Sequence, residues 1–339
     1  MTIKLGYGLI TCQSHPGDLR SSQDLVDEAL VLGLHAESLG LRSVWVSEHH
    51  HVDDGHLGAL FPMLAAMAAS TKSIQLGTGL LLAPLHEPLR IAEEAAVVDL
   101  ISHGRLILGL GLGWRDEEFR VIGIDQSLRV SRLIDAVAVL RCAGGGKPTR
   151  TGTDQKPIGR ITPRSPRLGG PPLWIGALAE PGMVRAGQLA DGFLATEVTP
   201  SELGAAAQVV RAAAAAAGRD PAQVAMGVHL PTLVTEAPWA EVRDRIRYPG
   251  WKYEDMEGQV GGEGPLRYPG PWGEGEEARL MDTSVVGTPE AVAKRIREYA
   301  DSVGGNLTFV ARSYLPGSGE RAQMEALMRL GEVKALLDQ

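Results

Sequence analysis

Cysteine is nearly absent from this sequence, because only Cys12 and Cys142 occur among its 339 residues. Two thiols so far apart match no metal-ligand spacing and are too few for a disulfide framework, so we expect both to be reduced. Basic residues are not in excess either: 33 Lys and Arg stand against 41 Asp and Glu, for a net charge of −8. A nucleic-acid partner needs a strongly basic face, and we therefore expect none.

Long apolar runs are also missing. No stretch approaches the ~20 apolar residues of a membrane span, and the N-terminal MTIKLGYGLI lacks the basic region and apolar core of a signal peptide. We expect a cytoplasmic protein with no membrane partner. Hydrophobic residues make up 44% of the chain, which is enough for a large core.

Short β-branched or aliphatic runs alternate with longer helical patterns, which predicts a parallel sheet of βα units. The expected strands are IKLGYGLI, SVWVSEHH, SIQLGTGLLL, RLILGLGLG, PLWIGA, DGFLAT, QVAMGVHLPTLV and NLTFVARS. Eight such units predict a (β/α)₈ TIM barrel, formed as one domain over residues 1–339.

Helices are expected between these strands from the spacing of apolar residues. They start at about Asp24, Leu57, Pro88, Leu128, Pro181, Leu203, Thr288 and Arg321. Ser21 and Asp24 have the spacing of a capping box at the first of them.

Two stretches rich in Gly, Pro and charge interrupt the pattern, at residues 143–171 and 248–275. They follow the fourth and seventh strands, and long insertions of this kind are usually lids or binding loops. We expect one over each side of the catalytic face. Trp251, Tyr253 and Trp272 in the second either wall a substrate pocket or pin the lid.

The active site of such a barrel lies at the carboxyl ends of its strands. The residues expected at these ends, in order from the first strand to the eighth, are Thr11; Glu48, His49 and His50; Thr78 and Gly79; Gly111 to Trp114; Gly176 and Ala177; Thr196 and Glu197; His229; and Arg312.

The run Glu48-His49-His50-His51 is the most informative of these, since consecutive ionisable residues at a strand exit are costly to desolvate. At least one of His49 and His50 is a candidate proton donor, proton acceptor or anion stabiliser. We expect no metal, because neither an H-x-H spacing nor a second carboxylate motif is present. A plain polar loop is the remaining alternative.

The run GLGLGW at residues 109–114 is not a dinucleotide fingerprint, because its spacing is G-x-G-x-G rather than G-x-G-x-x-G. Its glycines either let a flat ligand approach the backbone or allow tight barrel packing. His15, His56, His86 and His103 fall in loops or at helix ends and are expected to be ordinary surface or capping residues. Glu93 and Glu94 could pair with Arg90 on a solvated helix face.

The segment SVWVSEHHH, followed by SIQLGTGLLLAPLHEPLRIAEEAAVVDLISHGRLILGLGLGWRDEEFRVIGID, closely resembles the bacterial luciferase-like (LLM class) flavin-dependent monooxygenases. ADGFLAT and VVGTPEAVAKRIREYADSVGGNLTFV extend the resemblance towards the end of the chain. The two insertions are not covered by it.

This resemblance implies an oxidoreductase that uses reduced FMN from a separate flavin reductase. In this family O₂ adds to the flavin as a C4a-hydroperoxide, which oxygenates a small organic substrate. His49 matches the catalytic histidine, and Thr78-Gly79-Leu80 matches a bulge, often with a non-prolyl cis peptide, that packs on the isoalloxazine. Glu93 matches a glutamate near the flavin. No nicotinamide fingerprint occurs, in keeping with electrons that arrive as reduced flavin.

One departure from the family concerns the flavin phosphate. Leu112 stands where the family has a phosphate-binding arginine, so the cofactor surface at Gly111 and Gly176 needs another phosphate site. The start of the fifth helix, at Leu178 and Ala179, would offer backbone N–H groups and a helix dipole. Glu180 would repel a phosphate there unless Arg185 offsets it, so we expect weak flavin binding.

Two alternatives remain open. The first is a coenzyme F420-dependent oxidoreductase of the same fold, although the Glu-His-His run favours FMN. The second is a non-catalytic flavin-binding accessory subunit, against which the retained His49 and Glu93 count. The family also suggests a homodimer. Leu64, Met67, Ile91 and Val98 supply either its contact face or barrel packing.

Overall fold

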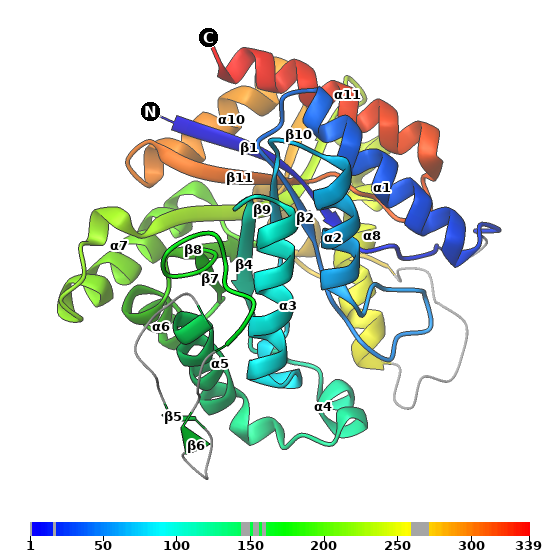
Figure 1. Cartoon of the computed structure of the whole chain (residues 1–339). Coiled ribbons are helices and arrows are strands. Elements are labelled where there is room, and N and C mark those ends of the chain that lie inside the picture. Colours follow the sequence, from blue (N-terminus) through cyan, green and yellow to red (C-terminus); the bar gives the residue numbers. More distant parts are fainter. Residues whose placement is uncertain (1, 16–17, 144–149, 152–155, 158–160, 259–270) are drawn as a thin grey trace.

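A closed parallel barrel organises the chain. The computed structural model describes residues 2–15, 18–143, 150–151, 156–157, 161–258 and 271–339. Within these residues eight parallel strands close into a ring, which confirms the expected TIM barrel (Figure 1). In ring order they are β1 (Thr2–Ile10), β2 (Ser43–Val46), β3 (Gln75–Thr78), β4 (Leu106–Leu110), β7 (Leu173–Gly176), β8 (Gly192–Thr196), β9 (Ala225–Val234) and β11 (Asn306–Arg312).

Helices cover the outside of this ring (Figure 1). They are α1 (Ser22–Ser38), α2 (Leu60–Ser70), α3 (Pro88–Ile101), α5 (Arg129–Ala143), α6 (Glu180–Leu189), α7 (Pro200–Ala216), α10 (Pro289–Ser302) and α11 (Gly319–Leu337). Three 3₁₀ turns also occur in the described chain: Ala83–Leu85, Gln126–Leu128 and Pro221–Gln223. Helix α1 starts with the expected capping box, in which Ser21 and Asp24 exchange side chain-to-backbone hydrogen bonds.

Side-chain alternation on the strands separates two apolar regions. Inward-facing Leu9, Trp45, Ile107, Trp174, Leu194 and Val310 fill the barrel and are at most 5% exposed. Their neighbours along each strand face outward and pack under the helices in a much larger core. Because successive strand residues alternate between the two faces, Thr196 and Arg312 point inward one layer above Leu194 and Val310.

Two short elements were not expected from the sequence. Helix α4 (Asp116–Ile122) follows β4 directly, and its acidic start favours a helix N-terminus. Strand β10 (Val285–Gly287) pairs in parallel with β9 outside the ring. Both are brief enough that apolar periodicity does not reveal them.

The first insertion does not form the expected lid in its described part. Strands β5 (Arg150–Thr151) and β6 (Lys156–Pro157) form a small antiparallel hairpin. Arg167 then donates to the Leu106 carbonyl at the start of β4 and pairs with Asp99 at 2.5 Å. Residues 161–171 therefore lie at the amino ends of the strands. The chain has already run back along α5, so this insertion connects a helix to a strand at the face opposite the catalytic one.

The second insertion is partly helical, which corrects the expected loop. Helix α8 (Trp239–Gly258) runs through Pro249 and includes the first residues of that segment. Helix α9 (Glu276–Asp282) follows it, and residues 259–270 lie outside the described part of the chain. Because α8 follows β9 directly, it starts at the carboxyl ends of the strands, where a lid was expected.

The proposed dimer residues on α2 and α3 belong to the interior. Leu64, Met67, Ile91 and Val98 are each at most 2% exposed, so packing against the barrel accounts for them. In the described residues no helix is long and apolar enough to span a membrane.

Candidate functional site

The mouth of the barrel has a glycine-lined side on β3, β4 and β7. The Gly79–Leu80 peptide bond after β3 is cis, as the resemblance implied. The Leu80 side chain lies over the neighbouring strands: a Cβ added at Gly176 would come within 2.4 Å of Leu80 Cδ1, and one at Gly111 within 3.0 Å. These glycines thus make room for Leu80, which supports the packing interpretation of the run at 109–114.

His49 lies at the same mouth, oriented by an acidic residue from another loop. Its Nδ1 is 2.9 Å from Oε1 of Glu118, which lies on α4, and the two side chains are 5% and 0% exposed. The backbone N–H of His50 donates to the same oxygen at 2.8 Å. When Nδ1 donates to Glu118 Oε1, Nε2 is the ring nitrogen left for a ligand.

Aromatic rings surround His49 on three sides. Tyr253 from α8 lies edge-on at 5.3 Å between ring centroids, His56 at 5.0 Å and Trp114 at 6.1 Å. Tyr253 therefore lies beside His49, whereas Trp251 is buried against Tyr248 and holds the helix in place. A lid role for α8 stays a prediction.

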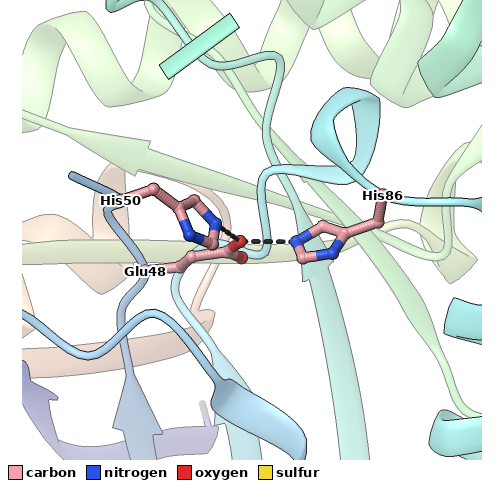
Figure 2. A group of neighbouring side chains, drawn as sticks. All are labelled: Glu48, His50 and His86. Atoms are coloured by element: carbon pink, nitrogen blue, oxygen red, sulfur yellow. Dashed lines mark hydrogen bonds and ion pairs between the residues drawn. The ribbon is translucent and has the colours of Figure 1, made fainter. Parts of the chain in front are cut away.

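His50 belongs to a second cluster beside the first. Figure 2 shows the Glu48 carboxylate between the imidazoles of His50 and His86, and each Nε2 lies 2.5 Å from Oε1. The other oxygen, Oε2, accepts the backbone N–H of Leu82 at 2.9 Å. A fully buried carboxylate with three donors is well satisfied.

The charges of this cluster favour one protonation pattern. Burial acts to raise the pKa of Glu48, but hydrogen bonds and charge from His50 and His86 outweigh it and lower that pKa to about 2. Burial likewise opposes a charged His50, yet the bond to Glu48 raises its pKa. The cluster therefore holds an anionic carboxylate and readily takes up a proton on His50.

These three side chains are also the one group in the described residues whose geometry could hold a metal ion, since their donor atoms lie within 4.8 Å of one another. The sequence spacing did not indicate this, because His86 comes from the loop after β3. All three groups are already engaged with each other, as Figure 2 shows. The absence of a metal stays a prediction.

The far side of the mouth, on β8, β9 and β11, is polar. Thr196 Oγ1 lies 3.4 Å from Nδ1 of His229, and burial together with nearby Arg312 lowers the pKa of His229 to about 3. Arg312 is 6% exposed, and its guanidinium lies 5.2 Å from the centre of the Tyr253 ring. Arg312 is the last residue of β11, and His229 pairs in register with Thr196, the last residue of β8.

The start of α6 is where the sequence suggested a phosphate site. Ala179 is the N-cap of this helix and makes no side-chain capping hydrogen bond, and Leu178 before it is exposed. Arg185 Nη1 lies 4.0 Å from the position of a Cβ at Gly182, in the first turn of the helix. Phosphate binding at Leu178 and Ala179 stays a prediction.

Three other proposed cofactor residues have different surroundings. Thr78 is buried and its hydroxyl donates to the Gly109 carbonyl, which joins β3 to β4. Leu112 is half-buried and packs against the outer core. Glu93 lies on α3, half-exposed and 3.6 Å from Arg90, so contact with a flavin stays a prediction for it.

Sequence reasoning missed Glu118 and gave the wrong role to two histidines. His86 bonds to Glu48, and His56 is buried against His49, so neither is an ordinary surface residue. Glu118 sits in the acidic run DEEF, and nothing in the sequence distinguishes it from Asp116 and Glu117. Its burial beside Phe119 is seen only in the structure.

This chain belongs to the luciferase-like monooxygenase family, whose model matches residues 6–305. Members of this family are flavin-dependent monooxygenases or related oxidoreductases, and the chain is an enzyme of that kind. The resemblance found in the sequence is therefore confirmed.

The similarity to individual curated proteins covers only part of this chain. The oxygenase component of flavin-dependent trigonelline monooxygenase from Acinetobacter baylyi is 29% identical over 174 residues, 50% of this chain and 48% of that protein. The chain thus matches about half the length of that curated relative.

Two solved structures show the same fold at full length. The oxygenating constituent of 3,6-diketocamphane monooxygenase from Pseudomonas putida, in complex with FMN, has a TM-score of 0.74 at 18% identity and covers 98% of this chain and 97% of its own. An F420-dependent secondary alcohol dehydrogenase, in complex with an F420-acetone adduct, has a TM-score of 0.72 at 18% identity, with 98% and 99% covered.

Proposed function

We propose that this protein is the oxygenase component of a two-component system, which takes reduced FMN from a separate flavin reductase and oxygenates a small organic substrate. The observation that carries this is the His49–Glu118 pair, buried at the carboxyl ends of the strands and covered by α8. The "oxygenase component" and FMN complex among its relatives support the same assignment.

The residues present fit a flavin. Leu80 offers an aliphatic surface on the glycine-lined side, which suits the face of a planar ring, and the uncapped start of α6 with Arg185 suits a phosphate. Glu118 Oε2 is buried and has no hydrogen-bond partner among the described residues, so it is ready to accept from a ligand. Gly111, Gly176, Leu178 and Ala179 would line this cofactor site.

When bound, reduced FMN supplies the electrons that activate O₂. The protein's own contribution is made by His49, whose Nε2 can hold or deliver a proton at the oxygen where charge develops. Glu118 fixes the ring and its tautomer. Tyr253 and Trp114 exclude water from the imidazole.

His50 has a different part in this proposal. Its ring bonds to Glu48 rather than to a ligand at His49, so we assign it a role in storing a proton beside the site and not in the reaction itself. We propose that this cluster keeps the strand 2 exit in place and buffers its charge.

A second candidate is hydride transfer with coenzyme F420 in the same site, which the F420-dependent dehydrogenase of this fold supports. A non-catalytic accessory subunit is the third, and the oriented His49 counts against it. We also propose a cytoplasmic location, a single domain over residues 1–339 and a homodimer. Exposed Leu89, Val97, Leu100 and Ile101 on α3 are the candidates for the dimer contact.

Two measurements test the function. Anaerobic titration with FMN, reduced FMN and F420, followed by flavin fluorescence, should show the tightest binding for reduced FMN. When the reduced complex is mixed with O₂ in a stopped-flow instrument, flavin reoxidation should be slow and pH-dependent. In His49→Ala this slow, pH-dependent phase should be absent. Tighter binding of F420, or identical reoxidation in His49→Ala, would contradict the assignment.

A further inference from the structure

Arg312 is a buried cation that lacks a counter-charge. It is the last residue of β11 and faces the barrel mouth above Val310. Within the described chain its only hydrogen bond runs from Nη2 to the Pro249 carbonyl at 3.3 Å, and no carboxylate lies within 4.0 Å of it. A guanidinium has five N–H donors, so most of its capacity is unused.

The surroundings of Arg312 do not offset its charge. Tyr253 lies under the guanidinium, and burial, with a smaller contribution from Arg312, lowers the pKa of both His56 and His229, so these two imidazoles are neutral neighbours. The cation Lys252, by contrast, has Asp54 at 2.7 Å. Burying a charge without a partner is costly, so a bound anion would stabilise Arg312.

Two arginines on α8 have the carboxylate partners that Arg312 lacks. Arg247 lies 2.6 Å from Glu276, and Arg243 lies 2.9 Å from Glu277. Both also lie over the Trp272 ring. These two side chains build the contact between α8 and α9, whereas Arg245 on the same helix bonds to the Ser318 hydroxyl.

The position of Arg312 separates it from the proposed cofactor surface. Leu80 and the start of α6 follow β3 and β7, with β4 between them in the ring. Arg312 ends β11, which two strands separate from β3 on one side and from β7 on the other. A flavin that spans β3 to β7 would leave this arc open, and Tyr253 links it to His49 through ring contacts at 5.2 and 5.3 Å.

We propose that Arg312 anchors a carboxylate of the organic substrate, which orients the rest of that molecule across Tyr253 towards His49. The inference rests on the proposed function, because it assigns the substrate class of the same site. A planar, bidentate guanidinium matches carboxylate geometry and discriminates an acid from its neutral amide.

The test compares matched acids and amides on the full chain. Acetate, benzoate and octanoate are each titrated against acetamide, benzamide and octanamide at constant ionic strength, with and without bound FMN, and Kd is measured by ligand-observed NMR. We expect the acid of at least one pair to bind about tenfold or more tightly than its amide, as charge-assisted hydrogen bonds imply. Arg312→Met should abolish this preference, and Arg312→Lys should keep part of it.

Arg321→Met is the matched control, because it removes the same charge from an exposed site on α11 and should retain the acid preference. Melting temperature separates a binding role from a structural one. An uncompensated charge destabilises the free protein, so Arg312→Met without ligand should melt at the same temperature or higher. A clear loss of melting temperature would mark Arg312 as a structural residue and overturn the proposal.

Two further results would also overturn it: acids no tighter than amides in all three pairs, or a preference that persists in Arg312→Met. If Arg312→Met instead weakens FMN binding about tenfold, the anion it holds belongs to the cofactor. Failure of the proposed function looks different, since it would show as tighter binding of F420 than of reduced FMN, or as unchanged reoxidation in His49→Ala, whatever the preference for acids.

Discussion

Lys252 Nζ and Asp54 Oδ2 lie 2.7 Å apart, and both side chains are almost completely buried, at 1% and 0% exposed. The pair joins α8 to the loop after β2, the same loop that carries His49 and His56. Asp54 also accepts from Gln13 Nε2 at 2.8 Å, so the loop after β1 is tied into the contact. This contact therefore ties α8 to the loops after β1 and β2.

Breaking this pair should destabilise the fold. Lys252→Met leaves Asp54 charged, buried and without its cation, and we expect a loss of about 3 to 5 kcal/mol in the free energy of unfolding, measured with urea. The double variant Lys252→Met/Asp54→Asn removes both charges and should recover much of that loss. A single-variant loss below about 1 kcal/mol would mean that α8 is held by other contacts.

Glu118 should hold His49 in place during flavin reoxidation. In Glu118→Gln an amide replaces the carboxylate that bonds to His49 Nδ1 and to the His50 backbone N–H, so the reoxidation rate should move about tenfold towards that of His49→Ala. Stopped-flow mixing with O₂ measures this rate. Glu117→Gln is the control on the same helix, where Glu117 pairs with Arg120 and His51, and it should keep the rate of the unmodified protein. Equal rates for Glu118→Gln and the unmodified protein would remove Glu118 from the mechanism.

His229 should make the protein less stable in mild acid. Its pKa is lowered to about 3 in the fold but is about 6.5 in the unfolded chain, so below pH 6.5 only the unfolded chain binds the proton. Stability therefore falls as the pH drops from about 6.5 towards 3. Between pH 7 and 5, His229→Gln should gain about 2 kcal/mol relative to the unmodified protein. Parallel stability curves for the two proteins would show that His229 is not buried in its neutral form.

Metal should not be required. Because Glu48, His50 and His86 satisfy one another, protein purified with EDTA should contain less than ~0.1 equivalent of any transition metal and keep its melting temperature and flavin binding. Elemental analysis before and after EDTA measures this. A stoichiometric metal whose removal lowers the melting temperature would instead make the three side chains its ligands.

Local patterns in the sequence predicted the strands and helices better than they predicted the loops. The eight strands follow from short apolar runs, and the Ser21 capping box follows from the spacing of Ser21 and Asp24. The cis Gly79–Leu80 bond came from family resemblance instead.

Contacts between distant loops could not be found in this way. Glu118 reaches His49 across 69 positions of sequence, and His86 reaches Glu48 across 38. Neither spacing identifies a contact in the sequence, because the two loops meet only when the barrel has formed. The Gly and Pro residues at 248–258 predicted a loop. Burial of Trp251 and Lys252 instead supports a helix there, despite Pro249.

Leu80 fills the space that three glycines leave open, and this decides how the entrance could be enlarged. Bulkier residues at 109, 111 or 176 would push against its methyl groups or the β3 backbone, so that half of the wall tolerates little variation. Shortening the side chain at position 80 would widen this side of the mouth without disturbing the strands. The same change would remove the aliphatic surface proposed for the flavin, so a wider opening here would come at a cost in cofactor binding.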